Sequence, residues 1–173
     1  MAFMKSSISF SLALLATIFV LISTSTAESH GSPFCDKSPD HGLCKKLIDG
    51  AETWPEAMKN SLTAIMEKAK AGKPIVNGVK SKLPKDLDDE TKESIETTCK
   101  DAYESMISNI KECMVLLKKN RHSSLMSYLS STSWSDCEDG LEEFRVSAPE
   151  VAEFGKEMQK MSSVTLAVAH AKP

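Results

Sequence analysis

Residues 89–119, DETKESIETTCKDAYESMISNIKECMVLLKK, decide the fold of this chain. Apolar side chains recur there at steps of three or four residues, which is the spacing of one face of an α-helix and not the alternation of a strand. Charged side chains occupy the opposite face. We therefore expect one long amphipathic helix, against which the other elements pack. Its buried face is predicted to consist of Ile95, Cys99, Ala102, Met106, Ile110, Cys113 and Leu117.

The first 27 residues differ in composition from the rest of the chain. Lys5 is followed by a mostly apolar run over residues 8–22 and by small residues at positions 25–27. This order is typical of a secretory signal peptide. A membrane anchor is the alternative, but the run is shorter than the roughly 20 apolar residues that span a bilayer. We predict a signal peptide over residues 1–27 and one domain over residues 28–173, without a membrane segment after cleavage.

Charge and reactive side chains argue against several classes of function. Lys and Arg number 21 against 24 Asp and Glu, a formal net charge of −3, and no basic stripe with interleaved aromatic residues indicates nucleic-acid binding. Neither a phosphate-binding glycine loop nor a nucleophile motif occurs. We therefore predict no enzyme activity, no cofactor and no metal. The histidines lie on expected loops and chain ends, without a carboxylate at a useful spacing: His30, His41, His122 and His170.

Residues 54–69 and 149–168 carry the same helical periodicity as the central stretch. The first of these helices should break near residues 72–74, because Pro74 lacks an amide proton and clashes with the preceding turn. The lysine-rich linker that follows still allows a helical continuation, and Asp88 is well placed to cap the central helix. The positions that favour the continuation are Ile75, Val76, Val79 and Leu83.

A further helix returns antiparallel to the central one after a turn at residues 120–122. Ser123 is its expected N-cap, and the serine-rich run over residues 130–135 should interrupt it before residues 137–144 resume. Four amphipathic helices with short connections predict an all-α fold, an up-and-down four-helix bundle.

Cysteines set the covalent framework, and an odd number of them leaves at least one unpaired. Cys35 and Cys44 enclose a polar turn, so a bridge between them would close a short hairpin; zinc binding with His41 is the alternative, although the spacing fits no common zinc pattern. Cys99 and Cys113 lie about 21 Å apart along one helix and cannot bridge each other. Cys137 must therefore take one of them, and geometry leans only slightly towards Cys99.

Four motifs in this order resemble the plant invertase and pectin methylesterase inhibitor domain family. Residues 35–44 are similar to its Cys-x8-Cys turn, and Cys99 followed by Tyr103 is similar to a Cys and Tyr on its central helix. The serine-rich run into Cys137-Glu-Asp-Gly140 and the small and aliphatic tail at residues 161–168 also match. The resemblance covers essentially all of the chain after residue 27.

This resemblance implies the bridges Cys35–Cys44 and Cys99–Cys137, with Cys113 free. It also implies that a short, disulfide-closed N-terminal helical hairpin precedes the bundle. The implied function is that of a secreted inhibitor that docks on a cell-wall pectin methylesterase and blocks its active cleft, as a monomer in a 1:1 complex. We expect the protein in the apoplast or cell wall, with the vacuole as the alternative.

Two alternatives to pectin methylesterase inhibition stay open. The target could be an acid invertase, although the short Pro-Lys-Phe element of invertase inhibitors is absent. The methionine stripes would also suit a non-inhibitory carrier of small ligands, although such stripes are usually core packing. Asp136 departs from the family, which commonly has Thr there. The candidate target contacts, all near the second bridge, are Trp134, Asp136, Glu138 and Glu142; Trp134 could instead pack over the disulfide.

Overall fold

Helix α4 (Asp89–Lys118) is the longest element of the computed structural model, which describes residues 32–132 and 135–173. Asp88 caps it by accepting a hydrogen bond from the Thr91 amide at 2.8 Å. Its last turn differs from the prediction, because Leu116 is buried and Leu117 is only half-buried. Steps of three and four residues match the helical repeat of 3.6 residues only on average, so the buried face shifts slowly around the helix. After Cys113 the buried face continues at Leu116 and not at Leu117.

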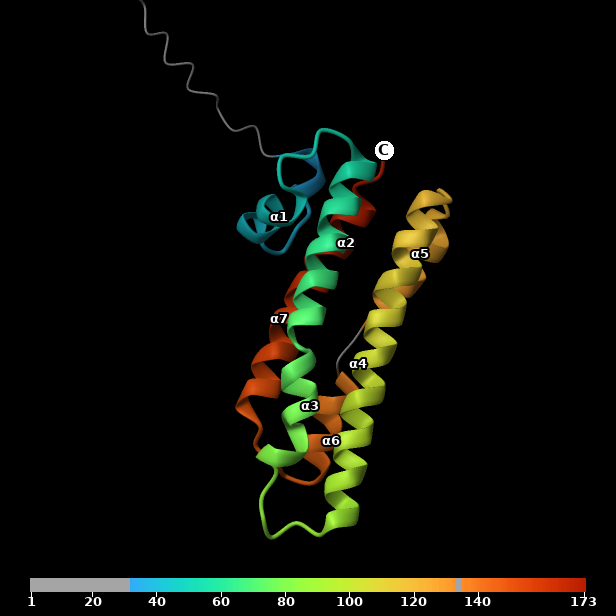
Figure 1. Cartoon of the computed structure of the whole chain (residues 1–173). Coiled ribbons are helices and arrows are strands. Elements are labelled where there is room, and N and C mark those ends of the chain that lie inside the picture. Colours follow the sequence, from blue (N-terminus) through green and yellow to red (C-terminus); the bar gives the residue numbers. More distant parts are fainter. Residues whose placement is uncertain (1–31, 133–134) are drawn as a thin grey trace, which may run out of the picture. The chain divides into compact units, whose positions relative to one another are not determined.

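All regular elements within the described residues are helical, as the sequence predicts. The bundle consists of four columns, of which α4 and α7 (Pro149–His170) are continuous and two are interrupted. In chain order the other elements are η1 (Pro33–Cys35), α1 (His41–Ile48), α2 (Trp54–Ala71), α3 (Lys73–Lys82), α5 (His122–Ser130), α6 (Ser135–Glu143) and α7 (Pro149–His170) (Figure 1).

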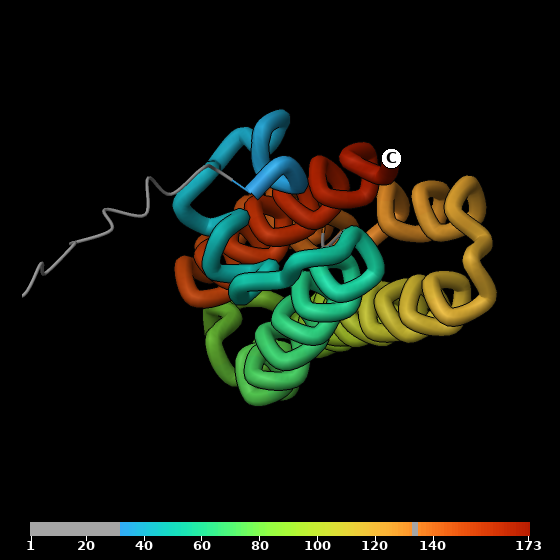
Figure 2. Tube along the Cα trace, turned by 90° about the horizontal axis from the view of Figure 1, so that it is seen from above, coloured from blue at the N-terminus to red at the C-terminus, as the bar shows by residue number. Residues whose placement is uncertain are grey.

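The columns pack in a ring, which Figure 2 shows in a view from above. The α2–α3 column and the α5–α6 column each contact both α4 and α7. Helices α4 and α7 therefore lie diagonally across the bundle. The N-terminal hairpin of η1 and α1 packs against α7 and α2, and the Cys35–Cys44 disulfide closes it with 5.7 Å between the Cα atoms.

The predicted interruption near Pro74 is present, but the chain stays helical through it. Gly72 keeps a right-handed helical conformation, and its amide donates to the Lys68 carbonyl at 3.1 Å. Helix α3 therefore continues the same column, and it buries Val76 and Val79 as a continuation requires.

Two tight turns with left-handed residues end α4 and α6. Asn120 has a positive φ of 52°, and the amide of the next residue, Arg121, donates a hydrogen bond to the Leu116 carbonyl. This pattern is a Schellman motif. The same pattern occurs at Arg145 (φ 54°), where the Val146 amide donates a hydrogen bond to the Leu141 carbonyl. Each motif satisfies carbonyls that a helix end leaves without partners.

The prediction that Ser123 caps α5 is wrong. Helix α5 begins one residue earlier, at His122, and Arg121 occupies the N-cap position without a side-chain capping bond. The Schellman turn has already fixed the direction of the chain at residue 121. His122 Nε2 also lies 2.9 Å from the Ala169 carbonyl, which anchors the first residue of α5 to the end of α7.

The buried side chains form two clusters, one above the other along the bundle. One surrounds the Cys99–Cys137 disulfide, and the other joins the N-terminal hairpin to Trp54 and the end of α7. Met114 and Met161 pack against both clusters and connect them. This core places the hydrophobic contacts inside the bundle and leaves polar features to its outer surface.

Candidate protein-docking site

Helix α6 is short, strongly acidic and covalently anchored. Cys137 joins it to Cys99 of α4 with 4.3 Å between the Cα atoms, and Leu141 packs into the core on the same face. Both anchors point inward, so the acidic side chains are left on the outer faces of the helix. Its carboxylates are Asp136, Glu138, Asp139, Glu142 and Glu143, and it contains no basic residue.

Residues 144–149 form the α6–α7 corner, where the chain reverses direction. The Schellman turn at Arg145 places a non-glycine residue in the left-handed region, which costs roughly 1–2 kcal/mol relative to glycine. Phe144 beside it is 39% exposed, and it is one of three large hydrophobic side chains that are exposed among the described residues. Pro149 then starts α7 at a position where its missing amide proton is not needed.

A hollow of about 560 Å³ lies along this corner. Glu138 and Glu142 of α6, Arg145 of the corner and Lys156 of α7 contribute to its lining, beside apolar atoms of Pro149. Charges of both signs therefore surround a small apolar floor. Such a surface can form ion pairs with a partner at its rim and exclude water at its centre.

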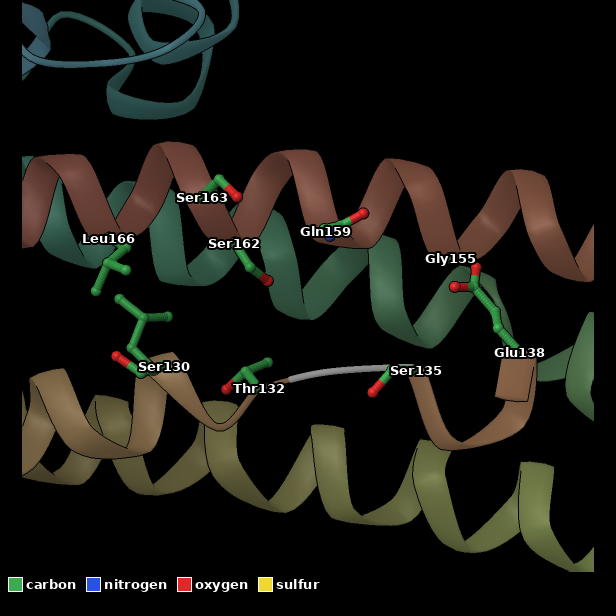
Figure 3. A pocket seen from close by; sticks show the side chains of 10 residues that line it. Ser130, Thr132, Ser135, Glu138, Gly155, Gln159, Ser162, Ser163 and Leu166 are labelled. Carbon is green, nitrogen blue, oxygen red and sulfur yellow. The ribbon is translucent and has the colours of Figure 1, made fainter. Parts of the chain in front are cut away.

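A second hollow, of about 220 Å³, lies between α7 and the α5–α6 column, and Figure 3 shows it with its side chains. Its lining is rich in hydroxyl and amide groups. These polar groups belong to Ser130, Thr132, Ser135, Gln159, Ser162 and Ser163.

Glu138 lines both hollows and is half-buried. Burial raises the pKa of its carboxyl group, the neighbouring Asp139 raises it further, and Lys156 opposes both effects. A carboxylate that is partly stripped of water in the free protein has less hydration to lose when a partner covers it. Among the carboxylates of α6, Glu138 is the one that is least exposed to solvent.

The predicted contact residues differ in how far they are buried. Asp136 and Glu142 are exposed, whereas Glu138 is half-buried between the two hollows. Trp134 lies outside the described residues. The sequence-based prediction missed the contribution of α7 to the lining of the second hollow, although Gln159, Ser162 and Ser163 stand at helical spacing.

The free thiol is that of Cys113, which is fully buried on α4 and 3.7 Å from the Leu125 carbonyl. Burial raises its pKa to about 12, and nearby Glu112 acts in the same direction. A thiol with this pKa carries almost no thiolate at neutral pH and is a poor nucleophile.

Two alternatives from the sequence find no support in this geometry. Cys35 and Cys44 are bonded to each other, so they are not zinc thiolates, and among the described residues no group of three or more His, Cys, Asp or Glu is arranged to hold a metal. The methionines expected to line a ligand cavity are mostly core residues. Met58, Met66, Met106 and Met158 are buried within the two clusters.

The fold places the described residues in the class of disulfide-cross-linked helical bundles with a packed core. Comparison with protein families narrows this class, because the family described as plant invertase/pectin methylesterase inhibitor matches residues 32–168. The chain belongs to this family. Its members are proteinaceous inhibitors and not enzymes.

Solved structures give the same fold. A mutant form of a pectin methylesterase inhibitor from Arabidopsis matches with a TM-score of 0.64 and 18% identity, over 80% of this chain and 94% of that one. A pectin methylesterase inhibitor from Arabidopsis thaliana matches with a TM-score of 0.60 and 19% identity, over 85% of this chain and 98% of that one.

A search of curated proteins gave no significant match. Among the helices of the described ranges, none combines the length and the apolar character that crossing a bilayer requires.

Proposed function

We propose that this protein is a secreted inhibitor of a cell-wall pectin methylesterase and that it blocks the active cleft of that enzyme. The observation that carries the proposal is the family match over residues 32–168, which includes both disulfides and all the helices named above except the last two residues of α7. The two covalent bridges restrict the conformations that the bundle can adopt. Binding then costs little conformational entropy, which favours tight complexes.

Two observations favour pectin methylesterase over acid invertase as the target. The Pro-Lys-Phe element associated with invertase inhibitors is absent from this chain. Both Arabidopsis proteins of the same fold are pectin methylesterase inhibitors. Acid invertase is the second candidate, since the family includes inhibitors of both enzymes.

The proposed docking surface consists of α6, the α6–α7 corner and the two hollows beside them. Trp134, Asp136, Glu138 and Glu142 are its proposed contacts, and Gln159 adds an amide from α7. The acidic face of α6 would steer the inhibitor towards a basic rim around the target cleft. Exposed Phe144 would supply an apolar anchor, the kind of residue that interface centres favour.

Residual activity tests the target. The purified, oxidised chain is mixed at apoplastic pH with a plant pectin methylesterase and, separately, with an acid invertase. We expect only the pectin methylesterase to lose activity. Loss of invertase activity alone would favour the second candidate, and full activity of both enzymes across several isoforms would contradict an inhibitory function.

Charge reversal tests the docking surface. Asp136→Lys/Glu142→Lys should weaken inhibition by on the order of tenfold or more, because two attractive charges become repulsive. Glu52→Lys/Glu67→Lys is the matched control, since it makes the same change of net charge at two exposed positions away from α6. Equal weakening by both variants would indicate a net-charge effect and would contradict the assignment of α6.

Export is proposed to depend on residues 1–27, which lie outside the described residues. N-terminal sequencing of the protein secreted into culture medium should begin at residue 28. Retention of the chain in cells, or an intact N-terminus on the secreted form, would contradict a cleaved signal peptide.

A further inference from the structure

A groove of about 660 Å³ runs between α4 and the α2–α3 column, and it shares no lining residue with the two hollows beside α6. Lys70 and Lys73 contribute to one wall, where α2 passes into α3. Lys100 and Lys111 of α4 contribute to the other. We call this feature the lysine groove.

The positive charge of the lysine groove does not follow from the composition of the protein. The chain as a whole has a formal net charge of −3, yet the lining contains these four lysines and one carboxylate, that of Glu104. Lys100 is partly neutralised by Glu96 at 2.8 Å. Within the described part of the chain, Lys70, Lys73 and Lys111 form no ion pair within 4.0 Å.

The floor between the lysines is apolar and partly aromatic. Tyr103 and Ile107 are half-buried there and Val76 is buried, while the amide of Asn77 and the hydroxyl of Ser108 stand at exposed positions. A ring surface with hydrogen-bonding groups beside it can accommodate the apolar face of a sugar and its hydroxyls together.

The length of the lysine groove suits a polymer better than a single sugar. Lys100 and Lys111 are separated by eleven positions on one helix, which corresponds to about 16 Å along its axis. A small carboxylate would meet one of these ammonium groups at a time. A chain with a carboxylate on each unit can meet lysines along both walls.

We propose that the lysine groove binds a linear acidic polysaccharide, a polyuronate whose carboxylates pair with the lysines while sugar rings rest on Tyr103 and Ile107. The expected affinity for a row of carboxylates follows from the lining of the lysine groove and does not depend on the proposed function. The choice of a polyuronate as their source rests on the proposed pectin-related target. The proposal adds a second surface, by which the protein would be held on the polymer that its target modifies.

Binding of polygalacturonate tests this proposal without measuring inhibition, so its failure is distinguishable from failure of the proposed function. Immobilised polygalacturonate should retain the oxidised chain at low ionic strength and release it as salt is raised. Fully methyl-esterified polygalacturonate, which lacks the charges, should not retain it. Heparin serves as a densely charged polyanion of different geometry.

Lys73→Glu/Lys111→Glu should weaken retention on polygalacturonate by on the order of tenfold or more, and Lys73→Gln/Lys111→Gln by less. Lys45→Glu/Lys46→Glu reverses two exposed lysines of α1 and should leave retention almost unchanged. Circular dichroism melts check that all variants fold. The proposal is overturned if the wild-type chain is not retained, if the esterified polymer retains it equally, if heparin binds more tightly, or if the α1 variant loses as much binding as the groove variant.

Discussion

Gly72 and Gly78 lie six residues apart in the same column, yet a methyl group added to each meets different surroundings. A Cβ on Gly72 would overlap the ring of Phe154 in α7, whereas nothing lies within 4 Å of a Cβ on Gly78. Neither residue has a positive φ, so backbone conformation does not require glycine at either position. Gly72 is therefore needed for close packing of α7 against the α2–α3 junction.

Alanine substitutions separate these two cases. Gly72→Ala should lower the free energy of unfolding by about 1–2 kcal/mol, because overpacking outweighs the gain in helix propensity. Gly78→Ala should raise it by about 0.5–1 kcal/mol. Urea denaturation measures both. If the two variants changed stability equally, the close contact with Phe154 would not be the reason for glycine at position 72.

The thiol of Cys113 should be inert in the native protein. Its burial and its pKa of about 12 leave almost no thiolate available to a reagent at pH 8. Ellman's reagent should therefore give no rapid reaction with the oxidised chain and one equivalent after unfolding in guanidinium. Rapid stoichiometric reaction of the folded protein would contradict this burial.

At the scale of elements, carboxylates stabilise helix starts in a way that depends on pH. Hydrogen bonds from the Thr91 amide and hydroxyl lower the pKa of Asp88 below its ordinary value of 3.8, and bonds from Thr53 lower that of Glu56 below 4.5. A carboxyl group whose pKa is lower in the folded state than in the unfolded state stabilises the fold fully at pH values above its unfolded-state pKa. This stabilisation is lost as the pH falls through its folded-state pKa. Glu138, whose pKa is raised by burial, acts in the opposite direction.

Stability should therefore fall as pH drops from about 4.5 through the lowered pKa values of these caps. Asp88→Asn tests the cause, because asparagine caps a helix as well as aspartate does but does not titrate. We expect this variant to match the wild type at neutral pH and to lose less stability in acid. Identical acid profiles, measured by thermal melts from pH 2.5 to 7, would show that this cap does not contribute.

The helices could be predicted from the sequence because burial repeats at 3.6 residues, and the break at Pro74 follows from a missing amide proton. Helix ends were harder to predict. Ser123 has a good capping side chain, but the Schellman turn at Asn120 and the contact of His122 with Ala169 set the start of α5. Neither feature follows from local propensity.

The candidate site could be predicted only in part for the same reason. Asp136, Glu138 and Glu142 stand close together in the sequence, beside Cys137. Their relation to Gln159 and Ser162 depends on which face α7 turns towards α6, and that is decided by packing of the whole bundle. Helical spacing excluded a Cys99–Cys113 bridge, but it left both Cys99 and Cys113 as candidates for Cys137, because the two lie at similar distances along α4 from the position expected to face Cys137.

At the scale of the whole molecule, the two disulfides constrain the unfolded chain to different extents. Cys35–Cys44 closes a loop of 9 residues and Cys99–Cys137 a loop of 38. The chain-entropy treatment gives about 2.5 and 4 kcal/mol, respectively. The longer bridge also holds the acidic helix α6 against α4, so it links stability to the proposed docking surface.

Paired serine substitutions test this difference. Cys99→Ser/Cys137→Ser should destabilise the protein more than Cys35→Ser/Cys44→Ser, by about 1–2 kcal/mol. The Cys99/Cys137 variant should also inhibit less well at temperatures where both variants remain folded. Equal inhibition by the two variants would indicate that the position of α6 does not matter for binding.

The central claim is that the oxidised chain inhibits a pectin methylesterase by occupying its cleft, and a titration tests it most directly. Enzyme activity is measured against increasing amounts of the chain at a low and a high concentration of pectin. We predict that activity falls to near zero at one equivalent and that high pectin concentration relieves the inhibition. Unchanged activity, or inhibition that pectin does not relieve, would contradict a cleft-blocking inhibitor.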